Sequence, residues 1–216
     1  MLSYDFHEIV VALSRGLILD VGCGTGEIMH ELSRFRKRTI GVDISLSYLK
    51  EAKIKGLSCI QGDAHFLPFR ENVFDTVIAL DVIEHLEDPL RFLKECNRVL
   101  KRRGIIFIHT PNKWMTEIRR CLTKWPGWHP EHIHEFIPYE LSGYLTRAGF
   151  VNMKVLMAEP PLFLLNFILS RRKKVFFKNS KKLKSSYYLC LTRALIKFIR
   201  KFPILSQGYL MKATKP

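Results

Sequence analysis

The chain has 216 residues, 47% of them hydrophobic and 25% charged, which is enough for one sizeable α/β domain with an appendage and excludes a wholly disordered protein. Its five cysteines are odd in number and scattered without a C-x-x-C pair, which argues against a disulfide framework or a zinc knuckle and for a reducing compartment. The formal net charge of +15 is concentrated at one end, because residues 160–216 hold 14 Lys and Arg and no acidic residue, whereas residues 1–159 hold 21 basic and 20 acidic residues.

The sequence carries no sign of export or of a membrane span. Its first residues lack the basic and apolar regions of a secretory signal, and no stretch reaches 18 uninterrupted apolar residues. We therefore expect a cytoplasmic protein.

The first half of the chain alternates apolar runs with helical patterns. The helical patterns predict helices at 4–14, at 45–56 and at 88–101, with Ser45 and Asp88 as caps, and one more helix that follows the glycine-rich segment after residue 22 and ends at Phe35. The apolar runs predict strands at 17–22, 39–45, 58–64, 74–82 and 104–112. Such alternation implies parallel βαβ units and an open, doubly wound sheet.

The rest of the chain predicts two more strands separated by a long insertion. After a loop over 113–137, the pattern predicts a helix at 138–150 and alternating strands at 151–157 and 208–215. We expect these two strands to pair as the last, antiparallel strands of a seven-stranded sheet. The predicted organisation is therefore one domain from 1–157 and 207–216, interrupted by a basic helical insertion at 158–206.

Polar residues follow the predicted strands where each strand ends. Gly22, Gly24 and Gly26 come directly after the first strand and let the backbone turn tightly and approach a ligand. Their spacing differs from the G-x-G-x-x-G of dinucleotide sites, and the absence of a following Lys-Ser/Thr excludes a P-loop. Asp43 ends the second strand, where it suits a ribose diol, and Asp63 follows the third, where it suits the exocyclic amine of adenine.

These motifs resemble, in order and spacing, those of the class I S-adenosylmethionine-dependent methyltransferases. The resemblance rests on LDVGCGTGE, GVDIS, GDAHFLPF, FDTVIALDVIEHLEDP and RVLKRRGIIFIHTPN, and it covers about residues 15–157 and the final strand. It implies a Rossmann-like, mostly parallel sheet with an antiparallel last strand, S-adenosyl-L-methionine (AdoMet) as cofactor and S-adenosyl-L-homocysteine (AdoHcy) as product. The implied cofactor residues are, for the amino-acid moiety, Asp20, Gly22, Cys23, Gly24 and Gly26; for the ribose, Asp43 and Ile44; for the adenine, Asp63 and Ala64; and beside the methionine end, Leu80 and Asp81.

Histidines are the candidate bases for methyl transfer to oxygen or nitrogen. A base for the acceptor proton is usually needed, and histidine titrates near neutrality. The candidates are His85 after the fourth strand and His132 and His134 in the loop HPEHIHEF; we select His134 and His85. Cys23 is interpreted as a small residue of the turn, since nothing nearby would lower its pKa.

The stretch from Asp81 to His85 resembles the E-x-x-E-H stretch of ubiquinone-pathway O-methyltransferases, which bind a divalent metal there. Two carboxylates and one imidazole are suitable ligands. Asp81 replaces the first Glu, however, and the same stretch occurs in relatives without a metal, so we expect no metal.

The motifs also restrict the methyl acceptor. No N/D-P-P-Y/F segment follows the fourth strand, which argues against methylation of exocyclic amines of bases, and no cysteine stands where methylation of pyrimidine C5 requires one. The amino-acid sequences of the motifs are most similar to those of the methyltransferases that act on small molecules, quinones, lipids and glycan precursors.

The basic insertion favours an anionic surface as a partner. Residues 160–169 are apolar, 171–174 and 178–184 are basic, and 187–202 form a helical pattern with an aromatic and apolar face opposite a basic one. This arrangement is typical of a helix at a membrane interface. Two alternatives stay open, a stripe that covers the domain's own core and a nucleic-acid grip; the second is less favoured because the aromatics segregate from the basic residues.

Three functions follow from these patterns. The first is AdoMet-dependent methyl transfer to O or N of a hydrophobic or membrane-associated small molecule, such as a lipid, a quinone or a lipid-linked sugar, by a cytoplasmic enzyme that docks peripherally on an anionic membrane through 160–202. The second is methylation of RNA or protein, with the basic segment gripping the substrate. The third is a non-catalytic AdoMet-binding scaffold.

Overall fold

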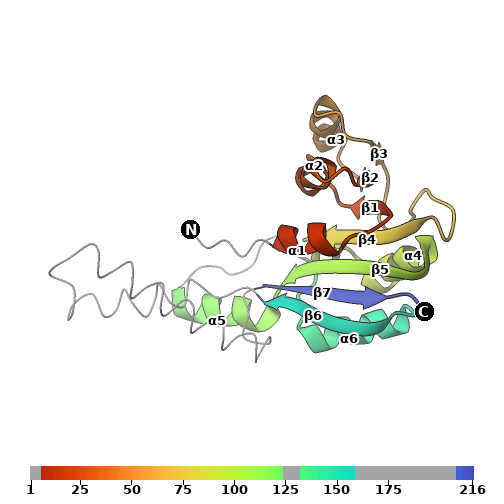
Figure 1. The fold of residues 1–216 in the computed structure, drawn as a ribbon. Helices are drawn as coiled ribbons and strands as arrows, with labels where there is room; N and C mark the ends of the chain where they lie inside the picture. Colours follow the sequence, from red (N-terminus) through yellow and green to blue (C-terminus); the bar gives the residue numbers. More distant parts are fainter. Residues whose placement is uncertain (1–5, 124–131, 159–207) are drawn as a thin grey trace, which may run out of the picture.

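The computed structural model describes residues 6–123, 132–158 and 208–216, which form one seven-stranded sheet with helices on both faces (Figure 1). The strands lie in the order β3-β2-β1-β4-β5-β7-β6. Their bounds are Leu17–Val21 for β1, Arg38–Asp43 for β2, Cys59–Gln61 for β3, Phe74–Leu80 for β4, Leu100–Pro111 for β5, Val151–Ala158 for β6 and Gly208–Thr214 for β7.

The pairing of the strands confirms the predicted sheet. β1 pairs in parallel with β2 and β4, and the parallel pairs β2–β3 and β4–β5 extend the sheet on either side. β7 inserts antiparallel between β5 and β6. The carboxyl ends of β1, β2 and β4 therefore meet at one edge of the sheet, where open α/β sheets bind their ligands.

Local signals start the helices where the sequence predicts. The Ser45 hydroxyl accepts the N–H of Tyr48 at 3.4 Å, and the Asp88 carboxylate accepts the N–H of Arg91 at 2.9 Å, so both act as N-caps. The helices of the described residues are α1 (Phe6–Leu13), α2 (Glu27–Arg34), α3 (Leu46–Ile54), α4 (Pro89–Val99), α5 (Lys113–Thr123) and α6 (Pro138–Arg147), with a 3-10 turn, η1, at Ile83–His85.

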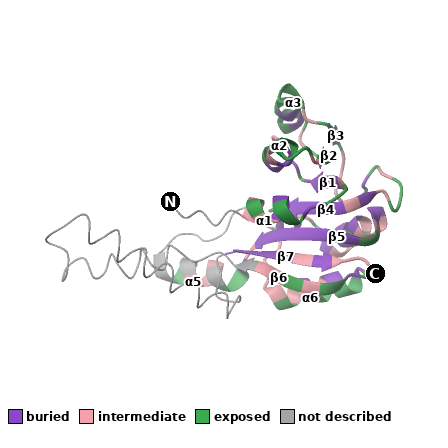
Figure 2. Cartoon of the chain, viewed as in Figure 1, coloured by how far each residue is buried: buried purple, intermediate pink, exposed green. Residues whose placement is uncertain are grey.

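Apolar side chains on the two faces of the sheet form separate clusters. On one face, Val10 of α1 and Leu32 of α2 pack with Ile18, Ile78 and Phe107 of the strands. On the other face, α4 and α6 pack against the same strands through Phe92, Leu93, Leu141 and Leu145. Figure 2 shows the resulting burial of the central strands between the helix layers. Burial on both faces explains why these strands are apolar without alternation.

The structure corrects three of the predicted boundaries. The predicted loop over 113–137 begins instead with α5, because the Asn112 side chain accepts the N–H of Trp114 at 3.2 Å and caps a helix. The predicted helix over 88–101 ends at Val99, because Leu100 already pairs with Phe74 in the sheet. The third strand is limited to the three residues of β3.

The predicted insertion lies almost wholly outside the described residues. Ala158, its first residue, ends β6 and pairs with Tyr209 of β7. Among the helices that the structure describes, none is both long and apolar enough to cross a membrane.

Candidate active site

The turn after β1 forms the floor of the site. Gly22, Gly24 and Gly26 have φ angles of 70°, 51° and 82°, a left-handed region that other residues enter at a cost. A Cβ on Gly22 would lie 2.4 Å from Cγ2 of Val82, so this position also requires close approach of the backbone to the Val82 side chain, directly before η1. A Cβ on Gly24 would meet nothing within 4 Å, which leaves open space above the turn.

Asp20 is a buried carboxylate at the end of β1. Only 2% of the residue is exposed, and its Oδ2 atom has no hydrogen-bond partner among the described residues. Burial, together with the neighbouring Asp43 carboxylate, raises the pKa of Asp20 to about 8. A cation beside this oxygen would complete its hydrogen bonding and favour its ionised form. The carboxylate therefore suits the ammonium group of an amino acid.

Two cavities open above the turn. The first, of about 290 Å³, is lined by Asp20 together with Cys23, Leu80 and, from α1, Phe6 and His7. The second, of about 620 Å³, is lined by Asp43, Ile44, Asp63, Ala64 and His85 among others. Four residues line both cavities: Gly22, Gly24, Tyr48 and Asp81. A ligand with an amino-acid end and a nucleoside end would fit across this shared wall.

Asp43 ties the end of β2 to the glycine turn. Its Oδ2 accepts the N–H of Gly24 at 2.8 Å, and its Oδ1 accepts the N–H of Ser45 at 2.8 Å. The carboxylate is thereby held in one orientation at the wall of the second cavity. Such a fixed acceptor suits the two hydroxyls of a ribose.

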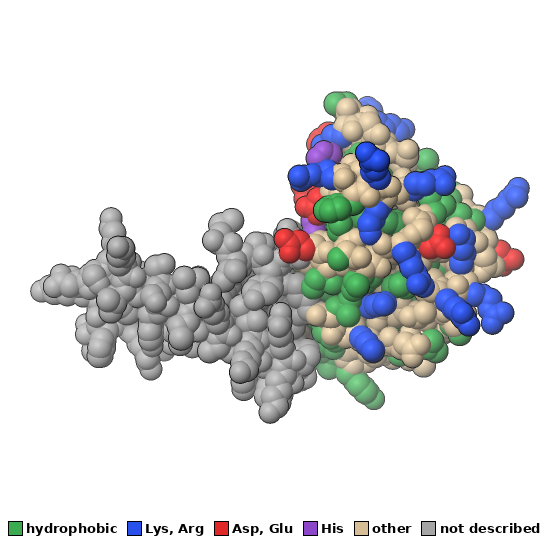
Figure 3. All heavy atoms as spheres, in the orientation of Figure 1, with side chains coloured by type: hydrophobic (Ala, Val, Ile, Leu, Met, Phe, Trp, Pro, Cys, Tyr) green, Lys and Arg blue, Asp and Glu red, His purple; other side chains and the backbone are tan. Residues whose placement is uncertain are grey.

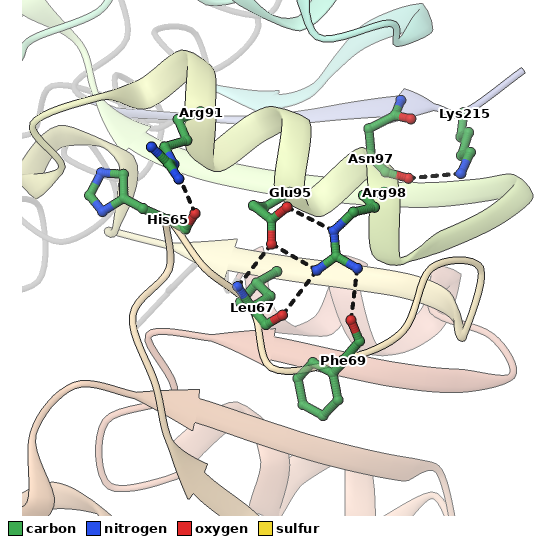
Figure 4. Close-up of polar contacts among 8 residues, drawn as sticks. All are labelled: His65, Leu67, Phe69, Arg91, Glu95, Asn97, Arg98 and Lys215. Carbon is green, nitrogen blue, oxygen red and sulfur yellow. Dashed lines mark hydrogen bonds and ion pairs between the residues drawn. The ribbon is translucent and has the colours of Figure 1, made fainter.

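Side chains of α4 hold the loop that carries Asp63 by hydrogen bonds to its backbone. Asp63 accepts the N–H of His65 at 2.8 Å, a bond that lowers the pKa of its carboxyl. Arg98 of α4 donates to the carbonyl oxygens of Leu67 and Phe69 at 3.0 and 2.7 Å, and Glu95 accepts the N–H of Leu67 (Figure 4). These contacts fix the loop over the second cavity.

Cys23 behaves as the small turn residue that the sequence predicts. Its side chain packs with Met29, Leu49 and Cys59, and only 7% of the residue is exposed. Burial, followed by the nearby Asp20 and Asp43 carboxylates, raises the pKa of its thiol well above the ordinary value. A thiol in this state is a poor nucleophile.

Asp81 is paired with a histidine that the sequence analysis did not select. Nδ1 of His109 in β5 lies 2.7 Å from Oδ1 of Asp81. His109 is only 5% exposed. The signal that could have found it is a lone imidazole within the apolar run IIFIH of a buried strand.

Glu84, His85 and His132 form a second group of polar side chains. Glu84 is 1% exposed; its Oε2 accepts the hydroxyl of Thr110 at 3.1 Å, and its Oε1 has no hydrogen-bond partner within the described part of the chain. Burial, followed by the charge of Asp81, raises the pKa of Glu84 to about 7. The rings of His85 and His132 meet edge to face, with centroids 4.8 Å apart.

One potential ligand atom from each of these three residues lies within 4.8 Å of the others, so this group has the donor set for a divalent cation. It differs from the stretch considered in the sequence, because Asp81 is directed to His109 and His132 contributes from the following loop.

The side chain of His134, the other selected base, is not one of the three potential ligands of this group in the described part of the chain. Its Nε2 is 3.4 Å from the carbonyl oxygen of Glu87, and among the described residues it lines neither cavity. The backbone N–H groups of Ile133 and His134 both donate to the carbonyl oxygen of Glu84, at 2.9 and 3.0 Å. The loop is therefore anchored on η1, and Ile133 reaches the second cavity.

The fold and the site together define an α/β domain of the nucleotide-binding kind, with carboxylates at the ends of β1 and β2 and in the loop after β3. The profile of the family described as "Methyltransferase domain" matches residues 19–108. The chain belongs to the class I S-adenosylmethionine-dependent methyltransferases.

The chain is also similar in sequence to curated proteins that are named as methyltransferases. A probable S-adenosylmethionine-dependent methyltransferase of Mycobacterium tuberculosis is 30% identical over 142 residues, which are 63% of this chain and 49% of the relative. A ubiquinone biosynthesis O-methyltransferase of Xanthomonas campestris is 30% identical over 162 residues, which are 67% of this chain and 66% of the relative. The chain thus spans between about half and two thirds of the length of these relatives.

A solved structure shares the fold. The crystal structure of a SAM-dependent methyltransferase from Thermotoga maritima, described as a possible histamine N-methyltransferase, has a TM-score of 0.67 at 19% identity and covers 97% of this chain and 87% of that chain.

Proposed function

We propose that the chain transfers a methyl group from AdoMet to an oxygen or nitrogen of a hydrophobic or membrane-associated small molecule. The observation that carries this proposal is the pair of cavities that share the Asp81 wall. Asp20 in the first would take the ammonium of the methionine moiety, and Asp43 and Asp63 in the second the ribose and the adenine. AdoMet supplies an electrophilic methyl group on a sulfonium; the residues orient it and accept the proton.

The acceptor loses one proton when its oxygen or nitrogen is methylated. His85 is the selected base that lines the second cavity, and Glu84 and His132 lie beside it. In this proposal the His85 imidazole takes the proton. The nearby Glu84, whose pKa of about 7 leaves about half of it ionised at neutral pH, stabilises the imidazolium when it is ionised, and no metal is required. His134 is the second candidate, and it would act only on an acceptor that extends beyond the cavity.

Substitution of the two histidines tests this assignment. We expect His85→Asn to lower kcat by about 100-fold, the usual contribution of a general base, with the Kd for AdoHcy unchanged within about threefold. His134→Asn is the matched control and should retain kcat within about threefold. The opposite ranking would transfer the role to His134, and loss of activity with EDTA, restored by a divalent cation, would contradict the metal-free proposal.

The acceptor class is supported by the basic segment and by one relative. The relative from X. campestris is named as a ubiquinone biosynthesis O-methyltransferase, and a prenylated quinone is hydrophobic. Residues 160–202 have the composition of an interfacial helix, although they lie outside the described residues. Lys and Arg side chains on the visible face of the described part are spread rather than gathered into one patch (Figure 3). We therefore propose 158–206 as the membrane dock of a cytoplasmic, peripheral enzyme.

A label-transfer assay tests the acceptor class. The protein is incubated with methyl-labelled AdoMet and an extract of its host, which is then separated into organic, nucleic-acid and protein fractions. Label in the organic phase is the expected result. Label that nuclease or protease removes would instead support methylation of RNA or protein, and AdoMet binding without any label transfer would support a scaffold.

A charge-neutralised variant tests the docking segment separately. Replacing Arg171, Arg172, Lys173 and Lys174 by Gln should weaken binding to vesicles containing anionic lipid, because each basic residue near such a surface contributes about 1 kcal/mol. Unchanged vesicle binding would contradict the docking proposal and leave the methyltransferase proposal intact.

A further inference from the structure

His109 occupies an unusual position for an imidazole. It belongs to β5, whose neighbouring residues Phe107 and Ile108 are fully buried, and it lies near the carboxyl end of the strand. Its side chain is 6% exposed, whereas that of its partner Asp81 is 51% exposed. In this pair His109 is buried and can hold the Asp81 carboxylate in place, whereas Asp81 is accessible and can contact a ligand.

Two hydrogen bonds connect His109 with Asp81. The Nδ1 atom lies 2.7 Å from the carboxylate Oδ1, and since a carboxylate only accepts, Nδ1 is the donor. The backbone N–H of Asp81 also donates to the carbonyl oxygen of His109, at 3.1 Å. Asp81 has a φ of 54°, in the left-handed region, which aspartate enters more readily than most residues other than glycine.

The ring of His109 also receives the N-terminal helix. Phe6, the first residue of α1, stacks on it with centroids 4.2 Å apart and planes 6° apart. Phe6 and the adjacent His7 line the first cavity. The same imidazole thus contacts two walls of that cavity, the carboxylate of Asp81 through its edge and α1 through its face.

We propose that His109 is a positioning residue of the cofactor site, which orients Asp81 by its Nδ1 donor and seats α1 over the methionine end of the cofactor by its ring face. The inference rests on the assignment of the two cavities to AdoMet. It requires no proton transfer by His109 and no direct contact between His109 and the cofactor.

Two variants of His109 separate the two contacts. His109→Phe keeps a ring for Phe6 but removes the donor, and we expect it to weaken AdoHcy binding about tenfold, the loss typical of a hydrogen bond to a charged group. His109→Asn keeps a donor near the position of Nδ1 but removes the ring. It should bind AdoHcy within about threefold of the parent, while the amides of residues 6–13 exchange hydrogen about tenfold faster.

A double-mutant cycle with Asp81→Ala shows whether His109 acts through Asp81. Calorimetric titration with AdoHcy should give a Kd about tenfold weaker for Asp81→Ala, and adding His109→Phe should then change it by less than about twofold. Because the Asp81 side chain is half-exposed, Asp81→Ala is expected to fold, and its own tenfold loss tests the inference even without the double variant.

Some outcomes would overturn the inference. A further tenfold loss in the double variant would show that His109 acts by another route, and unchanged α1 exchange in His109→Asn would remove its role as a seat for the helix. If the parent fails to bind AdoHcy, the cofactor assignment and this inference both fail. If the parent binds and His109→Phe binds equally well, the inference alone fails.

Discussion

Ionisation of Asp20 should control the affinity for the cofactor. The pKa of this buried carboxyl is raised to about 8, so about one tenth of it is ionised at pH 7 and about one hundredth at pH 6. An ammonium group beside Oδ2 favours the ionised form, so binding releases the proton. The Kd for AdoHcy should therefore fall about tenfold between pH 6 and pH 7, a range in which an α-ammonium keeps its charge.

Calorimetry checks both the slope and the proton. Titration with AdoHcy at pH 7 in buffers of different ionisation enthalpy should report release of about 0.9 proton per site. Asp20→Asn should abolish both the slope and the release, whereas Glu84→Gln, which removes a second carboxyl with a strongly raised pKa, should retain both. A parent protein whose affinity is flat between pH 6 and pH 7 would refute the reasoning.

Three other substitutions have clear expected results. Asp43→Ala should weaken AdoHcy binding at least about tenfold in a calorimetric titration, because it frees the N–H of Gly24 as well as removing the ribose acceptor; Asp88→Asn, outside the cavities, should change it by less than about twofold. Arg98→Ala should lower the free energy of unfolding in urea by about 2 kcal/mol, since two carbonyls and Glu95 lose a charged donor, whereas Arg98→Lys should lose less. The Glu84 carboxyl ionises near 4.5 when unfolded but near 7 when folded, so the free energy of unfolding should fall as the pH rises from 5 to 8. Over that range Glu84→Gln should lose about 2.5 kcal/mol less than the parent. Parallel pH profiles would contradict the burial of a proton on Glu84.

The order of the strands' apolar runs and most of the acidic residues around the site could be predicted from the amino-acid sequence alone. Apolar runs without alternation are a local property of buried parallel strands, and the residue that follows such a strand must lie at the carboxyl edge of the sheet. This reasoning brings Asp20, Asp43, Asp63 and Asp81 together before any coordinates are known. The roles of Gly22, Gly24 and Gly26 could be predicted for the same reason, because the positive φ angles of a tight turn after a strand are a local requirement.

Which side chains pair across the sheet depends on the tertiary structure. Asp81 and His109 are 28 residues apart, and they meet because the end of β4 lies beside β5 in one particular register. The contact of His132 with His85 and the position of His134 outside both cavities depend likewise on how one loop lies on η1. Such contacts depend on register and loop path, which hydrophobic periodicity does not specify, because it reports which face of an element is buried and not which residues face one another.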